Sequence, residues 1–190
     1  MKTRRAEILA ATARCFRKLG YKATSMEDIA NAVGIKAASI YNHFDATPKQ
    51  IMLQELSMQI AEQFTKGMKD IKEAALTADQ KLERIIALHI RLTVEHTDAI
   101  ALVTGDWIHL EEPIKSDYLK LRNAYENDLK HILEAGKASQ VIKNLNTDLL
   151  LYSLLSSLHW LYSWYSKNRN YNTIELEQQL TTCLLDGIRV

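Results

Sequence analysis

The scarcity of residues that interrupt helices constrains this chain more than any other feature. Only two prolines and six glycines occur in 190 residues, far fewer than a fold of many strands and hairpins needs for its turns. No segment keeps a strict alternation of apolar and polar residues, whereas apolar residues recur at helical spacing along most of the chain. The sequence therefore predicts an all-α fold.

Capping residues, glycines and a proline divide the chain into helices. Apolar residues at helical spacing predict a first helix over residues 8–19, which Gly20 ends. The stretch T-S-M-E-D at 24–28 contains two overlapping capping boxes, one led by Thr24 and one by Ser25, and predicts the start of a second helix. Further helices are expected at about 37–44, from Pro48 toward Asp70, and at about 78–96, 98–110, 114–136, 147–168 and 173–189.

Charge is distributed unevenly along the chain, although the net charge is only +1. Residues 1–50 contain nine Lys and Arg against four Asp and Glu, and the remaining 140 residues contain 15 against 19. A basic first quarter on an acidic remainder indicates two functions, the first of them directed at a polyanion. We place the domain boundary near residue 48, which gives domains 1–48 and 49–190 joined by the long helix that Pro48 opens.

The two cysteines, Cys15 and Cys183, are far apart and form no C-x-x-C or Cys/His pattern. A disulfide framework and a metal site are therefore not expected, and a reducing cytoplasm is the expected compartment. The sequence also contains no H-E-x-x-H, no G-x-S-x-G, no Gly-rich phosphate loop and no cysteine nucleophile with a plausible base. We expect neither an enzyme nor a bound cofactor.

Two apolar segments are too short for a targeting or membrane segment. The run at 8–13 ends after six residues at Arg14, which is too short for the core of a signal peptide. Residues 149–165 carry no formal charge, but they number only 17 and include four serines and His159. Since a spanning helix needs about 20 apolar residues, we expect a helix buried in a core and a subunit interface, and no membrane partner.

The most informative segment is 24–44, which predicts a helix-turn-helix. Its two short helices are joined by Val33-Gly34-Ile35-Lys36, where the glycine permits the positive φ that reverses the chain within roughly three or four residues. Ile35 fills the gap between the helices, and Ala30 is small where they cross. An ordinary helical corner without a DNA function is the alternative, although the basic charge of this region favours phosphate binding.

Several features of residues 8–56 occur in one fixed order. They are an apolar first helix with Phe16 near its end, the turn Gly20-Tyr21-Lys22-Ala23-Thr24-Ser25, then Asp28-Ile29-Ala30, Val33-Gly34-Ile35 and Ser39-Ile40-Tyr41-Asn42-His43-Phe44. In this combination the segment resembles the DNA-binding domain of TetR-family transcriptional regulators. The resemblance implies a dimeric regulator, usually a repressor, which leaves its operator DNA when a small molecule binds the C-terminal domain.

The start of the second helix and the third helix supply the candidate DNA contacts. Hydroxyls and free N–H groups at a helix start can hold a phosphate, the ammonium of Lys36 can reach guanine, and the amide of Asn42 suits adenine. By the resemblance, Tyr41 contacts a phosphate, and Lys49 replaces a lysine that the family often carries where this chain has Thr47. No arginine lies in the third helix, so DNA shape is expected to carry part of the specificity. The predicted DNA-binding residues are Thr24, Ser25, Lys36, Ala37, Ala38, Ser39, Tyr41, Asn42, His43 and Lys49.

Two apolar stripes near the C-terminal end predict a homodimer interface. By the resemblance, the last two long helices of each protomer form a four-helix bundle with those of a partner, and burial within one protomer is the alternative. A dimer also sets two recognition helices about 34–36 Å apart, as successive major grooves require. The predicted interface residues are Leu151, Leu154, Leu155, Leu158, Leu180, Leu184 and Ile188.

A small-molecule effector site is predicted from aromatic and polar-tipped side chains after the first domain, because ligand pockets are mostly apolar with a few polar anchors. The residues are His89, Trp107, His109, Tyr118, Arg122, Tyr125, His159 and Trp160. Packing in the core is the alternative for each of them, and Arg122 can pair with Glu126 one turn away as well as with a ligand anion. The pattern from Trp107 to Tyr125 resembles family members that sense acyl-thioester ligands.

Two functions remain open from the sequence. The first is a dimeric DNA-binding repressor that a small apolar or amphipathic ligand releases from DNA by tilting the helix that begins at Pro48. The second is a helical ligand-binding or interaction protein that no longer reads DNA, which the small, arginine-free third helix leaves open. Only the first requires a DNA affinity that falls steeply as salt rises.

Overall fold

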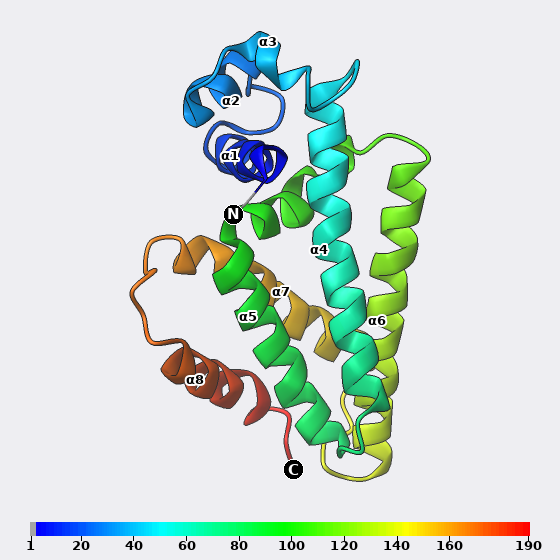
Figure 1. Cartoon of the computed structure of the whole chain (residues 1–190). Helices are drawn as coiled ribbons and strands as arrows, with labels where there is room; N and C mark the ends of the chain where they lie inside the picture. The colour runs from blue at the N-terminus through cyan, green and yellow to red at the C-terminus, as the bar shows by residue number, and fades with distance from the viewer. Residues whose placement is uncertain (1–2) are drawn as a thin grey trace. The chain divides into compact units, whose positions relative to one another are not determined.

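The computed structural model describes residues 3–190. These residues form eight α-helices, one 3₁₀ helix and no strand, with a single isolated bridge between Ile142 and Arg189. The elements are α1 (Arg4–Leu19), α2 (Met26–Val33), α3 (Ala37–Ile40), α4 (Pro48–Glu73), α5 (Ala78–Gly105), η1 (Asp106–His109), α6 (Ile114–Ala138), α7 (Thr147–Tyr165) and α8 (Thr173–Leu185) (Figure 1). The all-α prediction is confirmed.

The ends of the N-terminal helices follow the local rules that predicted them. α1 ends before Gly20, which has a φ of 86° and donates its N–H to the carbonyl of Phe16 at 2.7 Å. α2 ends before Gly34, which lies in the left-handed region with φ 72° and ψ 39°. α4 begins at Pro48, a residue suited to the first helical turn because no partner is available there for an N–H. The helix ends predicted from Gly20 and Gly34 and the helix start predicted from Pro48 are confirmed.

Only one of the two predicted capping boxes forms at the start of α2. The hydroxyl of Ser25 accepts from the N–H of Asp28 at 3.1 Å, and the carboxylate of Asp28 accepts from the N–H of Ser25 at 2.8 Å. The box led by Thr24 is wrong, because Thr24 is 1% exposed and its hydroxyl donates to the carbonyl of Gly20 at 2.8 Å. Thr24 therefore closes the turn after α1.

Several predicted helix bounds differ from those observed, most of all at α3 and α5. The third helix is regular only over Ala37–Ile40, and the chain continues to Phe44 as a turn and a bend. The helices expected at 78–96 and 98–110 form one helix, α5, with non-helical backbone at His96 (φ −133°, ψ 36°). The hydroxyl of Thr97 donates to the carbonyl of Thr93 at 2.7 Å, a type of bond that often bends helices. The predicted break therefore survives as a kink.

The described chain divides into two compact units, each built from separate stretches of sequence. Unit 1 comprises the chain up to Ala61 together with Asp98–Leu119, and unit 2 comprises Glu62–Thr97 together with Lys120–Val190. The predicted division at residue 48 is linear and stays a prediction. The grouping of 98–119 with the N-terminal helices arises from packing between distant segments, which no local pattern announces.

Unit 1 has one apolar core, to which its first three helices and α4 all contribute. Residues at most 1% exposed come from α1, α2, α3 and α4, namely Ile8, Phe16, Ile29, Ile40 and Met52. The same cluster contains Leu102 and Leu110, so the end of α5 and the segment after η1 are part of the body that carries the helix-turn-helix.

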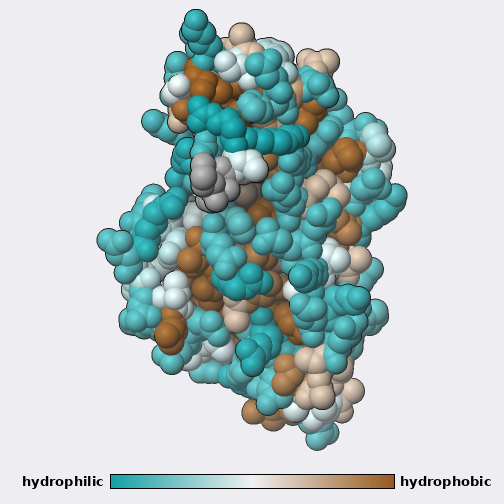
Figure 2. Space-filling view, in the orientation of Figure 1, coloured by the Kyte–Doolittle hydropathy of each residue, from teal (hydrophilic) through white to brown (hydrophobic). Residues whose placement is uncertain are grey.

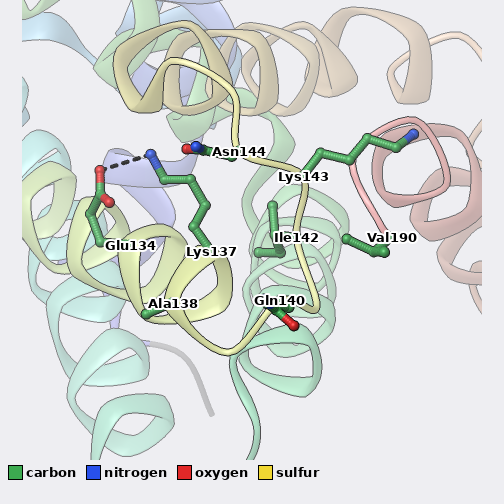
Figure 3. A pocket seen from close by; sticks show the side chains of 8 residues that line it. All are labelled: Glu134, Lys137, Ala138, Gln140, Ile142, Lys143, Asn144 and Val190. Carbon is green, nitrogen blue, oxygen red and sulfur yellow. Dashed lines mark ion pairs between the residues drawn. The ribbon is translucent and has the colours of Figure 1, made fainter.

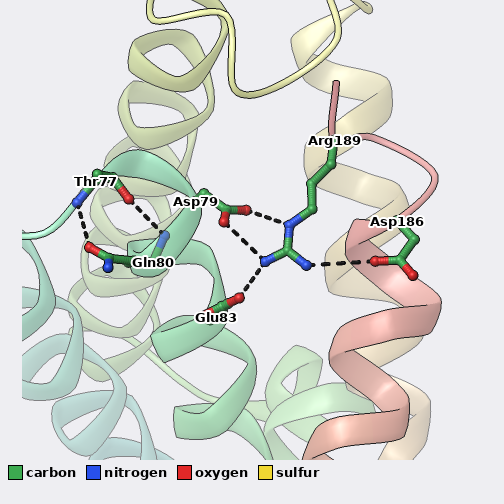
Figure 4. Close-up of polar contacts among 6 residues, drawn as sticks. All are labelled: Thr77, Asp79, Gln80, Glu83, Asp186 and Arg189. Atoms are coloured by element: carbon green, nitrogen blue, oxygen red, sulfur yellow. Dashed lines mark hydrogen bonds and ion pairs between the residues drawn. The ribbon is translucent and has the colours of Figure 1, made fainter.

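Unit 2 buries leucines and isoleucines of α5, α6 and α7, and its last residues are tied to the loop before α7. The N–H of Lys143 donates to the carbonyl of Ile188 at 2.8 Å. The guanidinium of Arg189 pairs with Asp79 at 2.7 Å, with Glu83, and with Asp186 at 3.6 Å (Figure 4).

On the face drawn in Figure 2, hydrophilic side chains predominate and hydrophobic ones lie in patches between them. Within residues 3–190, no helix combines the length and the apolar character needed to cross a membrane.

Candidate nucleic-acid interface

The segment 36–43 presents an outward-facing surface, which we call the α3 face. Its exposed residues are Lys36, Ala38, Tyr41, Asn42 and His43, and its half-buried residues are Ala37 and Ser39. Ile40 and Phe44 are 0% and 2% exposed in the core of unit 1, which turns the residues between them outward. No acidic residue lies in the segment. The α3 face can therefore approach a polyanion without repulsion between like charges.

The start of α2 is less open to an anion than its sequence predicts. Thr24 is buried, and the exposed Ser25 donates its hydroxyl to the carboxylate of Asp28 at 2.6 Å. This hydrogen bond and the one from the Ser25 N–H hold the pKa of Asp28 below its usual range, so the carboxylate is charged at neutral pH. A negative charge already occupies the position at the helix start where a phosphate is stabilised.

Lys49 is bound to the turn between α1 and α2. Its ammonium donates to the carbonyl of Lys22 at 3.0 Å and lies 4.7 Å from the centre of the Tyr21 ring, and burial lowers its pKa. The hydroxyl of Tyr21 donates to Gln50 at 2.6 Å, and the Gln50 amide donates to the carbonyl of His109 at 3.2 Å. Tyr21 and Gln50 were not among the predicted site residues, because a tyrosine in a turn gives no local signal of such contacts.

The residues predicted for the effector pocket fall into both units. Trp107, His109 and Tyr118 belong to unit 1, where the rings of Trp107 and Tyr118 stack at 6.2 Å and those of His109 and Tyr21 at 5.2 Å. Trp160 belongs to unit 2 and is 71% exposed, so its placement in an enclosed pocket is wrong. The helix period puts Trp160 on the side of α7 opposite its buried leucines.

The other predicted pocket residues meet in unit 2 as a buried polar cluster. The Nε2 atom of His89 lies 2.9 Å from the hydroxyl of Tyr125, and the ring of His159 lies 6.3 Å from that of His89. Phe64, which the sequence analysis missed, packs on His89 with ring centres 4.6 Å apart. Burial lowers the pKa of His89 to about 3 and also lowers that of His159. His89 is therefore a neutral hydrogen-bonding group at neutral pH.

Arg122 pairs with Glu126 at 3.0 Å. This ion pair is the alternative to a ligand contact that the spacing of one helical turn predicted.

A surface pocket of unit 2 lies elsewhere, where α6 ends and the following loop passes the last residue (Figure 3). Its lysines already have partners: Lys137 pairs with Glu134 at 3.0 Å, and Lys143 donates to the carbonyl of Gly187 at 3.1 Å. No residue of the predicted effector site lines it.

The apolar stripes predicted for the dimer interface are only partly available to a partner. Leu151, Leu154, Leu155 and Leu158 are at most 5% exposed within one protomer, so they have little surface left for a partner, as the alternative of burial within the protomer predicts. Leu180, Leu184 and Ile188 are half-buried.

The opposite side of α7 carries a different set of side chains, which we call the α7 face. Its exposed residues are Leu149, Tyr152, Ser153, Ser156, Trp160 and Trp164. Leu149 and Trp160 are 70% and 71% exposed, and these six positions share one side of a helix. An uncharged surface with this many large apolar side chains is typical of protein–protein contact.

Comparisons with known proteins agree on one family. A family model described as bacterial regulatory proteins, tetR family, matches residues 8–51, and one described as the tetracyclin repressor-like C-terminal domain matches residues 75–188. The HTH-type transcriptional repressor KstR2 of Rhodococcus jostii (strain RHA1) is 26% identical over 187 residues, which are 97% of this chain and 91% of that protein.

Solved structures share the fold of the whole chain. The ketosteroid transcriptional regulator KstR2 of Mycobacterium tuberculosis matches with a TM-score of 0.90 at 22% identity, over 100% of this chain and 97% of that one. AibR, in complex with isovaleryl coenzyme A and operator DNA, matches with a TM-score of 0.79 at 17% identity, over 95% and 97% of the two chains. At these identities the two structures speak for the fold alone.

Proposed function

The chain belongs to the TetR family of DNA-binding transcriptional regulators, and we propose that it acts as a dimeric repressor that a small apolar or amphipathic molecule releases from operator DNA. Its relatives are named as repressors, and the chain is a transcriptional regulator, not an enzyme. The observation that carries the proposal is the α3 face, a polar surface without acidic residues that the helix-turn-helix holds outward. A regulator of chromosomal DNA works in the cytoplasm.

We propose that the α3 face enters the major groove. Lys36 and Asn42 are exposed and carry the donors that read guanine and adenine. Tyr41 is 52% exposed, and its hydroxyl can reach a phosphate while Ala38 allows close approach to the bases. Ser25 and Lys49 are weaker candidates, because their polar atoms already serve Asp28 and the carbonyl of Lys22.

The proposed dimer uses the α7 face together with the half-buried residues Leu180 and Leu184 of α8. Large exposed side chains such as Tyr152, Trp160 and Trp164 provide the apolar area that a stable interface buries, and aromatic residues are enriched at such interfaces. Ser153 and Ser156 lie between them and allow two helices to approach closely. A closed twofold dimer gives the two copies of the α3 face that a palindromic operator requires.

The proposed effector site is centred on His89, Tyr125 and His159 in unit 2. These three side chains provide neutral hydrogen-bonding groups beside the ring of Phe64, which suits a largely apolar molecule that carries a carbonyl group. AibR binds isovaleryl coenzyme A, and KstR2 is named as a ketosteroid regulator; both ligand classes have this chemistry. We favour an acyl-type ligand, with Arg122 at the half-exposed edge of the cluster for an anionic group.

The experiment that tests the proposal starts from a pool of random DNA duplexes. Repeated selection on the purified protein should enrich a palindromic sequence, and binding of that duplex should weaken steeply as salt rises, because each neutralised phosphate releases counterions. The double variant Lys36→Ala/Asn42→Ala should lose the binding, whereas Lys69→Ala/Asn123→Ala, which changes exposed residues of unit 2, should keep it. Selection that enriches no sequence would contradict the proposal.

Release is tested on the same selected duplex. Isovaleryl coenzyme A and a ketosteroid are titrated separately into the protein–DNA complex, and at least one should dissociate it at a concentration that free coenzyme A does not match. The variant Tyr125→Phe keeps the ring and removes the hydroxyl that meets His89. It should bind DNA normally and need a higher effector concentration, which separates effector binding from DNA binding.

A further inference from the structure

The half of the α3 face that carries Asn42 and His43 lies outside the regular helix. α3 ends at Ile40, and three backbone hydrogen bonds hold the chain beyond it. The N–H of Asn42 donates to the carbonyl of Ser39 at 3.3 Å, and the N–H groups of His43 and Phe44 donate to the carbonyl of Ile40 at 2.9 and 3.1 Å. One turn of helix followed by three such bonds is weak by itself, because helix formation is cooperative. The orientation of Asn42 therefore depends on contacts with other elements, which include the core contacts of Ile40 and Phe44.

Arg5 of α1 adds three such contacts from one guanidinium group. Its Nη1 atom donates to the carbonyl of His43 at 3.4 Å, its Cζ atom lies 4.2 Å from the centre of the Phe44 ring, and its Nη2 atom lies 2.7 Å from the Glu55 carboxylate. The guanidinium thus joins α1, the end of the 36–44 segment and α4. Arg5, His43, Phe44 and Glu55 all lie in unit 1.

The chemistry of these contacts is particular to arginine. A guanidinium is planar, so it can stack on an aromatic ring while its N–H groups point to acceptors in the same plane, whereas a lysine ammonium offers no such plane. Carbonyls at the end of a helical turn lack intrahelical donors and favour a cation. The Glu55 carboxylate also balances the charge of Arg5, which reduces its attraction for a DNA phosphate.

We propose that Arg5 is a positioning residue for sequence readout: it fixes residues 41–44 so that Asn42 and His43 face the bases, and it makes no essential phosphate contact. This inference rests on the DNA-reading function proposed above for the α3 face. In this role, Arg5 increases the affinity for operator DNA relative to that for other DNA. A phosphate contact would instead affect both kinds of DNA equally.

The test uses the full-length protein, the selected duplex and a shuffled duplex of the same composition. Arg4 provides a matched control, since it lies beside Arg5 on the same helix but pairs only locally, with Glu7 at 2.7 Å. Arg5→Ala should lower affinity for the selected duplex roughly tenfold, the loss of a cation–π contact and an ion pair. Its affinity for the shuffled duplex should fall only by the small factor that the loss of one positive charge near DNA costs both duplexes, and the slope of affinity against salt should stay unchanged. Arg4→Ala should leave the ratio of the two affinities unchanged.

Arg5→Lys separates geometry from charge. The lysine keeps the positive charge beside Glu55 but has no planar group to stack over Phe44. Measured as the logarithm of the ratio of selected to shuffled affinity, the variant should therefore recover less than half of the discrimination that Arg5→Ala loses. The proposal is overturned if Arg5→Lys restores wild-type binding fully. It is also overturned if Arg5→Ala weakens both duplexes equally and reduces the salt slope by about 0.9, the value of one phosphate contact.

Glu55→Gln keeps the inference testable should Arg5→Ala fail to fold, as thermal unfolding and circular dichroism would reveal. Removing a carboxylate near DNA raises affinity for both duplexes by simple electrostatics. If Arg5 positions the segment, loss of its α4 anchor should instead lower the ratio of selected to shuffled affinity two- to fivefold. An unchanged ratio contradicts the inference. Failure of the DNA-reading function is recognised separately, because the wild-type protein would then enrich no sequence.

Discussion

The α3 face and the α7 face are both exposed on the protomer, yet they have opposite chemistry. The α3 face has Lys36, Asn42 and His43 and no acidic residue, whereas the α7 face has Leu149, Trp160 and four further uncharged residues. The first suits a hydrated polyanion and the second suits another apolar surface. Exposure therefore shows only that a surface is available for binding, whereas the chemistry of its side chains indicates which class of partner can bind there.

The difference also separates the two proposed interactions by their response to solvent. Binding at the α3 face should weaken with salt because it releases counterions, while association at the α7 face should be nearly indifferent to salt because it depends on buried apolar area. The two are nevertheless coupled, since both half-sites of an operator are held only when the dimer is intact.

Trp160→Asp should have the largest effect, because it places a charge at the centre of the α7 face. We expect monomers in sedimentation experiments. We also expect a loss of operator affinity of roughly 100-fold or more, since the α3 faces of the two protomers no longer bind as one unit. The fold of the protomer should be retained, because Trp160 is 71% exposed.

Ile108→Asp is the control for Trp160→Asp. Ile108 is also an exposed apolar residue, 54% exposed, but it belongs to η1 of unit 1. It should remain dimeric and bind operator as the wild type does. A dimeric Trp160→Asp variant would remove the α7 face from the proposed interface and leave α8 as the element to test.

Asn42→Ala should have the next largest effect, and it acts on the other face. Loss of a bidentate contact to a base costs about 1–3 kcal/mol of discrimination, so affinity for the operator should fall by roughly 10- to 100-fold while the dimer stays intact. Replacing the contacted base pair should cost the wild type as much and the variant almost nothing. A variant that discriminates as the wild type does would show that Asn42 reads no base.

Local signals in the sequence were sufficient for several helix ends and for the burial of Ile40 and Phe44, but not for the length of α3 or for the joining of two predicted helices in α5. Gly20, Gly34 and Pro48 act within a few residues of their own position, so the helix ends that they mark could be predicted. The two sides of α7 could not be told apart, because both are apolar and only the packing of unit 2 decides that Leu151 and Leu155 face inward.

Contacts between distant residues could not be predicted from the sequence for the same reason. His89 and Tyr125 are joined across 36 positions, and neither residue's neighbours differ from those of an ordinary helix. Arg5 was visible only as part of a basic N-terminal segment, while its role in unit 1 depends on where the chain places Phe44 and Glu55.

The interiors of the two units also differ, and this difference predicts a pH dependence of stability. Ile40 and Phe44 lie behind the α3 face, whereas unit 2 buries His89, whose folded pKa of about 3 lies below the unfolded value of 6.5. As pH falls below 6.5, the unfolded chain binds a proton that the folded chain does not, so stability is lost down to about pH 3. Between pH 6.5 and pH 5 the loss is about 2 kcal/mol at about 1.4 kcal/mol per pH unit.

Urea unfolding of His89→Gln measures this contribution. Glutamine can still meet the Tyr125 hydroxyl but has no charge to gain, so the variant should lose about 2 kcal/mol less than the wild type over the same pH interval. His131→Gln, at an exposed position of α6, should keep the wild-type dependence. Equal pH dependence in all three proteins would mean that His89 is protonated as readily in the folded state as in the unfolded one.

The smallest effect is expected for Arg189→Ala, which changes neither face. The guanidinium holds the end of the chain against α5 through Asp79 and Glu83 (Figure 4). Its side chain is 29% exposed, so solvent weakens these pairs and the free energy of unfolding should fall by only about 1 kcal/mol. Lys69→Ala breaks a more exposed pair, with Glu73 at 3.9 Å, and should change nothing measurable. Because the C-terminal residues lie directly after α8, a shift of the dimer dissociation constant in Arg189→Ala would mean that the interface depends on this anchor as well as on the α7 face.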